Sequence, residues 1–183
     1  ILLEVNGVAQ ELTGLSTESI VDMGIALVPE GRRLFPNLTV RENLLLGAYR
    51  LAARPARAKN LEFCFHAFPA LADRQKQLAG SMSGGEQQMV AIARAFMSVP
   101  KILVVDEPSV GLSPIMVKQV ISKIDELKVA HGLTVLMAEQ NFNQAIRIAD
   151  RGYVMVQGQV AFEGMDAAEL RDNDFVRKAY LGG

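Results

Sequence analysis

Short apolar runs and longer helical patterns alternate through the middle of the chain. The segments "IALVP", "KILVVDEP" and "LTVLMAEQ" are continuous apolar runs of strand length that end in polar residues. Such runs are typical of strands buried on both faces, as in a parallel sheet. Residues 114–131 have helical spacing, with Pro114 suited to the first turn and Gly132 to the C-terminal cap. The expected inner face of this helix consists of Val117, Val120, Ile121, Ile124 and Leu127. The strand–helix–strand order predicts an α/β layered domain.

Hairpin signals stand on either side of this pattern. Residues 1–5 read as a strand, and the Asn-Gly pair that follows is a strong turn signal. Near the other end, a Gln-Gly pair separates "GYVMV" from "QVAFEG" in the same way. We further expect short helices in "STESIVDMG" and "FNQAIRIAD", and an exposed helix over residues 166–181.

A mostly helical block interrupts the sheet pattern. Its first helix starts at Thr39, whose hydroxyl and Glu42 match a capping box, and residues 55–78 continue the helical pattern. We therefore expect an α/β core of residues 1–38 and 99–163, an inserted helical subdomain of residues 39–98, and a C-terminal helical tail of residues 164–183.

The stretch "SMSGGEQQMVAIARAF" places two glycines directly before an amphipathic helix. Ser83 and Glu86 match a capping box, so a plain helix cap is one interpretation. Capping needs no glycine pair, whereas Gly84 and Gly85 let successive backbone N–H groups turn toward one point at the positive end of the helix dipole. The second interpretation is therefore an anion site. We expect Arg94 to face solvent. The expected core residues of the helix are Met89, Ile92, Ala93, Phe96 and Met97.

Polar residues follow each of the three predicted strands. Ligands of open α/β sheets bind beyond the carboxyl ends of the strands. The polar residues at these ends are Glu30, Asp106, Glu107, Glu139 and Gln140. Because neighbouring strand residues point to opposite sides, Asp106 and Glu107 can hold two different groups, such as a metal-bound water and an attacking water. The simpler alternative is a strand that ends in a polar turn at Pro108.

Composition narrows the classes of function. The 183 residues fit one domain, and 50% of them are hydrophobic, which is enough for a sizeable core. A formal net charge of −1 gives no sign of bulk nucleic-acid binding. The single cysteine excludes an internal disulfide, and no apolar run approaches the ~20 residues of a membrane span. Because the sequence opens abruptly at Ile1, we expect it to be part of a longer chain.

Several conspicuous residues have ordinary interpretations. His66 and His131 lack partners at metal-ligand spacing, and Cys64 is expected to be a packed core thiol. Arg32 and Arg33 either are solvated or meet a membrane subunit. The aromatic residues expected in the core are Phe35, Phe63, Phe65 and Phe68.

Two of these segments together resemble a known family. "MSGGEQQMVAIARAF", followed after a short gap by "KILVVDEPSVGLSP", is similar to the signature motif and the Walker B strand of ATP-binding cassette (ABC) ATPases. "VPEGRRLFPNLTVRENL", "GSMSGGEQQ", "EQNFNQAIRIADRGYVMVQGQV" and the terminal "AYLGG" resemble one branch, the ATP-binding subunits of branched-chain amino acid importers. The resemblance covers nearly all 183 residues.

The resemblance implies a P-loop NTPase-like ABC ATPase fold, with an inserted helical subdomain and its N-terminal part missing. It also implies a motor that hydrolyses ATP sandwiched between two subunits. Ser83, Gly84 and Gly85, with Gln87 nearby, would contact the γ-phosphate of ATP held by the opposite subunit. The loop of residues 109–114 would cross the dimer interface.

The same resemblance assigns roles at the strand ends. Asp106 would hold Mg²⁺, largely through water, and Glu107 would polarise the attacking water as general base. Glu30 stands where the common pattern has glutamine, between the ATP site and the helical block. Gln140 stands where many members have histidine, and it can donate a hydrogen bond to a phosphate but cannot gain a proton. Ser113 replaces the aspartate usual in the interface loop.

The resemblance also implies partners and a location. These are a second ATP-binding subunit, transmembrane permease subunits gripped by residues 35–80, and indirectly a periplasmic or extracellular binding protein, at the cytoplasmic face of the cell membrane. A urea or short-amide importer is an alternative. The chain contains no G-x-x-x-x-G-K-[ST] phosphate loop, so a catalytically silent docking fragment is another. A nucleic-acid-acting ABC protein is disfavoured, because a basic surface and long inserted coils are lacking.

Overall fold

A three-stranded parallel sheet forms the centre of the computed structural model, which describes residues 1–5, 7–174 and 176. Its strands are β3 (Ile25–Val28), β4 (Ile102–Asp106) and β5 (Thr134–Ala138), in the order β3-β4-β5. The three apolar runs therefore form the expected parallel strands. The register pairs Val28 with Val105 and Asp106 with Ala138, so the carboxyl ends of the three strands meet at one edge.

The sheet is buried on one face only. Leu103 and Val105 of β4 are fully buried, in one core with residues of α5 (Gly84–Phe96) and α6 (Pro114–His131). On the opposite face, Leu27 is 57% and Leu136 is 62% exposed. The prediction of strands buried on both faces is therefore wrong for the described chain, because no other part of it covers this second face.

Local chemistry explains both long helices. Ser83 caps α5, and Glu86 completes the expected capping box, a contribution of about 1 kcal/mol. Ser113 caps α6, and Gly132 ends it in the left-handed conformation, with φ of 59°. The five residues expected on the inner face of α6 are all buried. Of the five core residues expected in α5 and at its C-terminal cap, four are buried, and Met89 packs against the core from a half-buried position.

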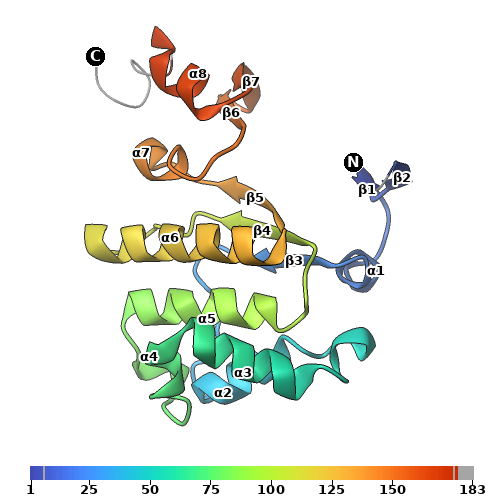
Figure 1. Ribbon diagram of the computed structural model, residues 1–183, viewed down its shortest axis with the longest axis vertical. Helices are drawn as coiled ribbons and strands as arrows, with labels where there is room; N and C mark the ends of the chain where they lie inside the picture. Colours follow the sequence, from blue (N-terminus) through green and yellow to red (C-terminus); the bar gives the residue numbers. More distant parts are fainter. Residues whose placement is uncertain (6, 175, 177–183) are drawn as a thin grey trace.

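The helical block contains several short helices, and Figure 1 shows it below α5. They are α2 (Val40–Leu46), η1 (Leu51–Ala53), α3 (Arg57–Ala67), α4 (Pro69–Ala72) and η2 (Ala79–Ser81). The capping box of Thr39 and Glu42 is confirmed. The helical pattern over residues 55–78 is broken, because Phe68 precedes a proline and leaves the helical region, with φ of −127° and ψ of 74°.

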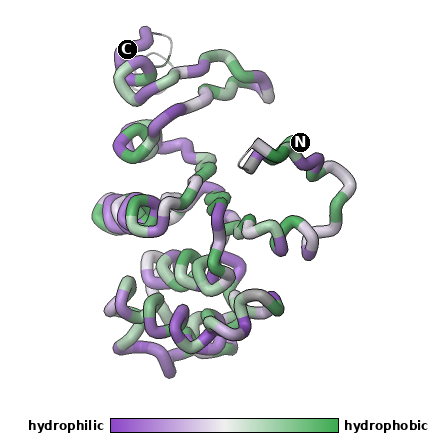
Figure 2. The backbone as a smooth tube through the Cα atoms, turned by 45° about the vertical axis from the view of Figure 1, so that its right-hand side comes forward, coloured by the Kyte–Doolittle hydropathy of each residue, from purple (hydrophilic) through white to green (hydrophobic). Residues whose placement is uncertain are grey.

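Helix α5 lies between the sheet and the helical block. It contacts β3 and α6 as well as α2, α3 and α4, and Figure 2 colours much of it as hydrophobic. Its contact with α2 requires a glycine, because a β-carbon at Gly47 would lie 1.9 Å from the carbonyl oxygen of Arg94. The strand-end loops and the helical block are therefore connected through one tightly packed helix.

Two hairpins and three short helices complete the described chain. The antiparallel pair of β1 (Leu2–Val5) and β2 (Val8–Glu11) confirms the first hairpin, and β6 (Gly152–Val156) with β7 (Gln159–Gly164) confirms the second. The helices are α1 (Thr17–Asp22), α7 (Phe142–Ala145) and α8 (Ala167–Asp172). Of the helix expected over residues 166–181, residues 175 and 177–181 lie outside the described residues.

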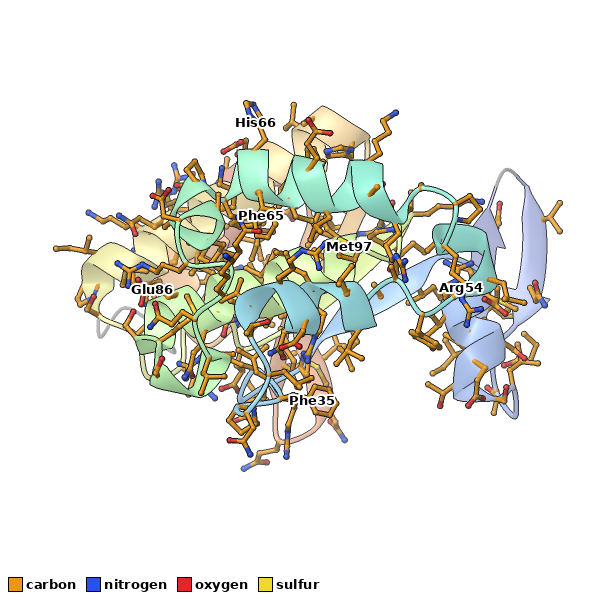
Figure 3. The ribbon with its side chains drawn as sticks, turned by 90° about the horizontal axis from the view of Figure 1, so that it is seen from below. Phe35, Arg54, Phe65, His66, Glu86 and Met97 are labelled. Carbon is orange, nitrogen blue, oxygen red and sulfur yellow. The ribbon has the colours of Figure 1, made fainter. Side chains whose placement is uncertain are left out.

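The residues with ordinary interpretations mostly behave as expected. Cys64 is fully buried, and burial raises the pKa of its thiol to about 12. The ring of His131 packs edge-on against Phe63. Phe35 departs from the prediction because it is 53% exposed; Figure 3 shows it at the periphery, whereas Met97 lies between the helices. The backbone N–H of Phe35 donates to Oδ1 of Asn43, and Nδ2 of Asn43 donates to the carbonyl of Phe35, so two hydrogen bonds fix this segment.

The described residues lack two further features. No helix there combines the length and the apolar character that crossing a membrane requires. No group of three or more His, Cys, Asp or Glu side chains is arranged there to hold a metal ion.

Candidate functional site

The ends of β4 and β5 bring Glu107 and Gln140 into contact. The Nε2 atom of Gln140 donates a hydrogen bond to Oε1 of Glu107 at 2.5 Å. The backbone N–H of Glu107 donates to the carbonyl of Ala138 at 2.9 Å, which fixes the first residue after β4 against the end of β5. A half-buried carboxylate thus sits at the carboxyl edge of the sheet, oriented by a side chain that remains neutral at any ordinary pH.

Asp106 and Glu107 differ in surroundings, although not for the reason that strand alternation suggests. Asp106 is the last residue of β4; it is exposed and has no side-chain partner among the described residues. Glu107 lies beyond the strand and adopts a left-handed backbone conformation, with φ of 42°. Such a conformation costs of order 1–3 kcal/mol in a residue with a side chain, and it is found preferentially at functional sites. The turn after β4, rather than alternation along it, separates the two carboxylates.

Glu139 bridges the two strand-end loops. Its Oε1 atom accepts hydrogen bonds from Oγ of Ser109 at 2.7 Å and from the backbone N–H of Asn141 at 2.8 Å. Its Oε2 atom accepts from the backbone N–H of Ser109 at 3.3 Å. The sequence indicated only that Glu139 follows a strand, because the contact with Ser109 spans 30 positions and leaves no local signal.

The N-terminus of α5 is capped and also accessible. Glu86 accepts hydrogen bonds from the backbone N–H and the hydroxyl of Ser83 at 2.9 and 2.8 Å, and these bonds lower the pKa of its carboxyl. The first backbone N–H groups of a helix have no partner within the helix and point outward at its positive end. The capping interpretation is therefore correct. It does not exclude the anion-site interpretation, because the cap leaves other backbone N–H groups of the first turn without a partner in the helix.

Gly84 and Gly85 differ in what a side chain at their positions would meet. A β-carbon at Gly85 would lie 2.1 Å from Cε of Met116, so Gly85 permits close packing of α5 against α6. A β-carbon at Gly84 would lie 3.3 Å from the Nη2 atom of Arg32, the far end of a flexible side chain. Packing thus accounts for Gly85, and Gly84 remains the better indicator of an approaching ligand.

Two arginines connect α5 to the loop that follows Glu30. Gly31, Arg32 and Arg33 all have positive φ values, of 68°, 66° and 43°. Arg94 of α5 donates to the backbone carbonyls of Arg32 and Arg33 at 2.9 and 2.8 Å, and burial lowers the pKa of its guanidinium. The prediction that Arg94 faces solvent is wrong, because its side chain holds this left-handed loop in place.

Arg32 itself lies over the N-terminus of α5. It is half-buried, and its Nη2 atom donates to the carbonyl of Val110 in the loop after β4, at 3.3 Å. Arg33 is exposed. The exposure of Arg33 agrees with a solvated side chain. Arg32 is not simply solvated, because its contact with Val110 joins segments 78 positions apart. Contact of either arginine with a membrane subunit stays a prediction.

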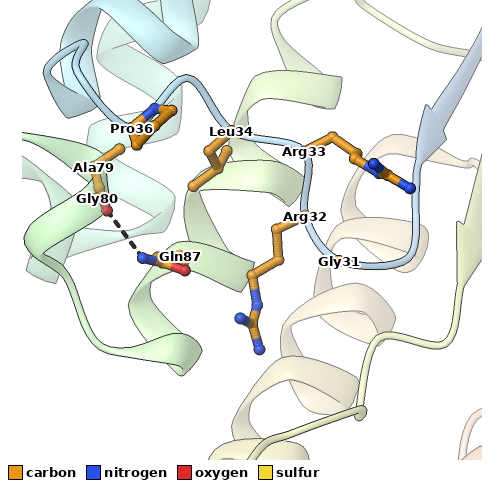
Figure 4. A pocket seen from close by; sticks show the side chains of 8 residues that line it. All are labelled: Gly31, Arg32, Arg33, Leu34, Pro36, Ala79, Gly80 and Gln87. Carbon is orange, nitrogen blue, oxygen red and sulfur yellow. Dashed lines mark hydrogen bonds between the residues drawn. The ribbon is translucent and has the colours of Figure 1, made fainter.

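The contacts of Gln87 and the exposure of Glu30 do not by themselves indicate a phosphate-binding role. The amide of Gln87 donates to the backbone carbonyls of Ala79 and Met82 at 3.1 and 3.2 Å, so it holds the turn before α5. It also lines a cavity of about 310 Å³ together with residues 31–34, Pro36 and residues 79–80 (Figure 4). Glu30 is exposed, two positions beyond the end of β3. The ATP-site roles of both residues stay predictions.

The residues at the strand ends fit a magnesium ion bound together with phosphates. Mg²⁺ in such sites is usually held by one or two carboxylates, by waters and by substrate phosphate oxygens, rather than by a cage of protein ligands. Asp106 offers an exposed carboxylate at the carboxyl edge of the sheet, without a competing partner in the described chain.

Comparisons with known proteins agree with the fold. The family model described as "ABC transporter" matches residues 4–110. The chain superposes on the crystal structure of an ATP-binding cassette of an ABC transporter in its ADP conformation with a TM-score of 0.77 and 27% identity, covering 95% of this chain and 74% of that one. A nucleotide-free ATP-binding cassette gives a TM-score of 0.74 at 26% identity, covering 95% and 75%. The predicted ABC ATPase fold is thereby confirmed.

Two curated relatives share a higher sequence identity with this chain than the two solved structures do. The high-affinity branched-chain amino acid transport ATP-binding protein BraG of Pseudomonas aeruginosa is 47% identical over 174 residues, which cover 95% of this chain and 73% of the relative. The probable branched-chain amino acid transport ATP-binding protein LivF of Archaeoglobus fulgidus is 37% identical, covering 94% and 72%. The chain therefore belongs to the ABC transporter family.

Proposed function

We propose that this chain is the ATP-hydrolysing subunit of an importer for branched-chain amino acids. The observation that carries the proposal is the bond from Gln140 to Glu107, which places an oriented carboxylate at the carboxyl edge of the sheet. The names of BraG and LivF support the branched-chain solute over urea or short amides. The permease and the binding protein contact the solute, and this subunit supplies the energy.

The strand ends carry the hydrolytic chemistry in this proposal. Glu107 takes a proton from the water that attacks the γ-phosphate, and Gln140 holds Glu107 and donates its second amide hydrogen toward a phosphate oxygen. Asp106 holds Mg²⁺, which neutralises charge on the phosphates when it is bound. The G-x-x-x-x-G-K-[ST] loop that grips the phosphates is not among residues 1–183, so turnover requires this element from outside them.

The N-terminus of α5 serves the opposite subunit. Ser83, Gly84 and Gly85 present backbone N–H groups and a hydroxyl to the γ-phosphate of ATP held by a second ATP-binding subunit, which is either identical or a paralogue. Arg32 adds a cation beside Gly84. ATP thereby joins the two subunits, and hydrolysis lets them separate.

The helical block provides the surface for the permease. Phe35 and Leu78 are 53% and 49% exposed, and they flank Pro36 and residues 79–80 at the cavity of Figure 4. Apolar side chains exposed close together are one feature of protein interaction sites. The chain would act as a peripheral subunit at the cytoplasmic face of the membrane, in indirect contact with a periplasmic or extracellular binding protein and without a nucleic-acid partner.

Solute uptake tests this function. In a strain whose gene for this protein is disrupted, uptake of radiolabelled leucine is expected to fall and to return with the wild-type gene but not with Glu107→Gln. Expression is checked by immunoblot, and uptake of labelled urea serves as the control solute. Normal leucine uptake in the disrupted strain, or loss of urea uptake alone, would exclude the branched-chain assignment.

Gln140→Ala is expected to slow ATP hydrolysis by the complete protein about 10- to 1000-fold, the range for loss of one transition-state donor. Because glutamine does not titrate, Gln140→His is expected to add a pH dependence near neutrality, where an imidazole changes charge. Steady-state phosphate release measured from pH 6 to pH 8.5 checks both variants. Wild-type rates and an unchanged pH profile would remove Gln140 from the site.

A further inference from the structure

We propose that Glu139 is a positioning residue that couples the interface loop of residues 109–114 to the pair Glu107 and Gln140. The inference rests on the proposed function, since it concerns how the hydrolytic pair is held. It assigns a role to a carboxylate whose hydrogen bonds go to Ser109 and Asn141 in the two strand-end loops.

Two bridges connect the loop after β4 with the loop after β5. Gln140 donates to Glu107, and Ser109 donates to Glu139 through both its hydroxyl and its backbone N–H. The direction of donation is opposite in the two bridges, because β5 supplies the donor in one and the acceptor in the other. Each loop therefore both gives and receives a side-chain hydrogen bond.

The bridges close a short ring of residues. Pro108 is buried, and it joins Glu107 to Ser109 with a fixed φ angle. On the other strand, Gln140 directly follows Glu139, whose carboxylate also binds the N–H of Asn141 and so fixes the turn around Gln140. The backbone bond from Glu107 to Ala138 closes the base of the ring. Any displacement of Ser109 is thus passed to Glu107 and Gln140.

The ring of residues lies next to the loop of residues 109–114, so the position of this loop affects the catalytic pair Glu107 and Gln140. Ser109 opens the loop that crosses the dimer interface in the proposed function, and the carbonyl of Val110 next to it accepts from Arg32 above the N-terminus of α5. Seating of a second subunit on this loop would therefore set the orientation of Glu107 through Glu139. A misplacement of about 1 Å at a reacting group costs on the order of 100-fold in rate.

The three bonds of Glu139 predict a graded series of variants. Glutamine keeps one acceptor oxygen, but its NH₂ group would face the N–H of Ser109, so Glu139→Gln loses one of the three bonds. Glu139→Ala loses all three. Ser109→Ala loses only the hydroxyl bond, and Ser109→Thr keeps that hydroxyl.

The test measures kcat, KM for ATP, the dissociation constant of ATP and thermal stability for the complete protein. We expect kcat to fall about 10- to 100-fold in Glu139→Ala and less in Glu139→Gln, with ATP affinity and Tm close to wild type. The double variant Ser109→Ala/Glu139→Ala should be no slower than Glu139→Ala. Both substitutions break the same connection between the two loops, so their effects should not add. Ser109→Thr should restore the rate lost in Ser109→Ala. Asp150→Asn, an exposed carboxylate paired with Lys128, is the matched control with an unchanged rate.

The outcomes separate this inference from the proposed function. A wild-type kcat in Glu139→Ala, or fully additive losses in the double variant, overturns the coupling. If Glu139→Ala folds poorly, Glu139→Gln and Ser109→Ala carry the same test, because each keeps part of the network. Should Glu107→Gln hydrolyse ATP normally, the hydrolytic pair itself is wrong; if Glu107→Gln is inactive while both Glu139 variants match wild type, only the coupling fails.

Discussion

Glu107→Gln is expected to slow ATP hydrolysis by about 100- to 10,000-fold, while ATP binding persists. Glutamine has the size of glutamate and can still accept from Gln140, but it cannot take a proton from water. The neighbouring carboxylate should fail differently, because Asp106→Asn weakens a magnesium ligand and so reduces Mg-dependent binding and catalysis together. Phosphate release gives the rates, and titration with a fluorescent ATP analogue, with and without Mg²⁺, gives the affinities.

The structure sharpens this contrast between the two carboxylates. Asp106 is exposed at the end of β4, whereas Glu107 is half-buried, bonded to Gln140 and held in a left-handed conformation. Substitution by glutamine leaves that backbone unchanged, so the loss of rate reports on the proton acceptor and not on the fold. Hydrolysis at the wild-type rate by Glu107→Gln would mean that "DEP" is only a polar strand end.

Gly84→Asp is expected to reduce ATP turnover by more than about 100-fold and to leave the fold intact. The new carboxylate would lie where the γ-phosphate of the opposite subunit must approach, and it would also engage the guanidinium of Arg32, whose Nη2 atom is 3.3 Å from the site of the β-carbon. Ser83 would still cap α5. Phosphate release by the complete protein and circular dichroism on thermal melting check the two parts of the prediction.

Gly85→Ala is the control that separates packing from ligand binding. Its β-carbon would overlap Cε of Met116, so a lower Tm is expected at this position. Gly84→Ala should instead retain the wild-type Tm, because Arg32 can shift. If Gly84→Asp hydrolysed ATP as fast as wild type, the N-terminus of α5 would be a cap and nothing more.

The fold was largely predictable because its elements carry local signals. Capping residues at Thr39, Ser83 and Ser113 begin three of the helices, and the buried stripe of α6 follows from apolar spacing alone. Burial of the sheet was predicted less well. An apolar run indicates that a strand suits burial on both faces, but the exposure of Leu27 and Leu136 depends on which other elements cover them.

The residue types of the candidate site could be predicted, and their connections could not. Glu107 and Gln140 are candidates because they follow apolar strands, and the parallel register brings those strand ends together. The contacts of Arg32, Arg94 and Glu139 join residues 30 to 78 positions apart, and no periodicity or capping pattern encodes such pairs. Glu107 also adopts a positive φ that its residue type disfavours, so only the surrounding structure determines it.

The oligomeric state of Glu107→Gln in Mg-ATP tests the central claim most directly. The complete protein, alone or with a second ATP-binding subunit, is analysed by size-exclusion chromatography with light scattering, in the presence and absence of saturating Mg-ATP. An ATP-dependent dimer is expected for Glu107→Gln, because ATP is bound but not hydrolysed, and adding Gly84→Asp should return it to monomers. A Glu107→Gln protein that binds ATP yet stays monomeric, or that dimerises equally well with Gly84→Asp, would contradict a site in which α5 of one subunit completes the ATP site of the other.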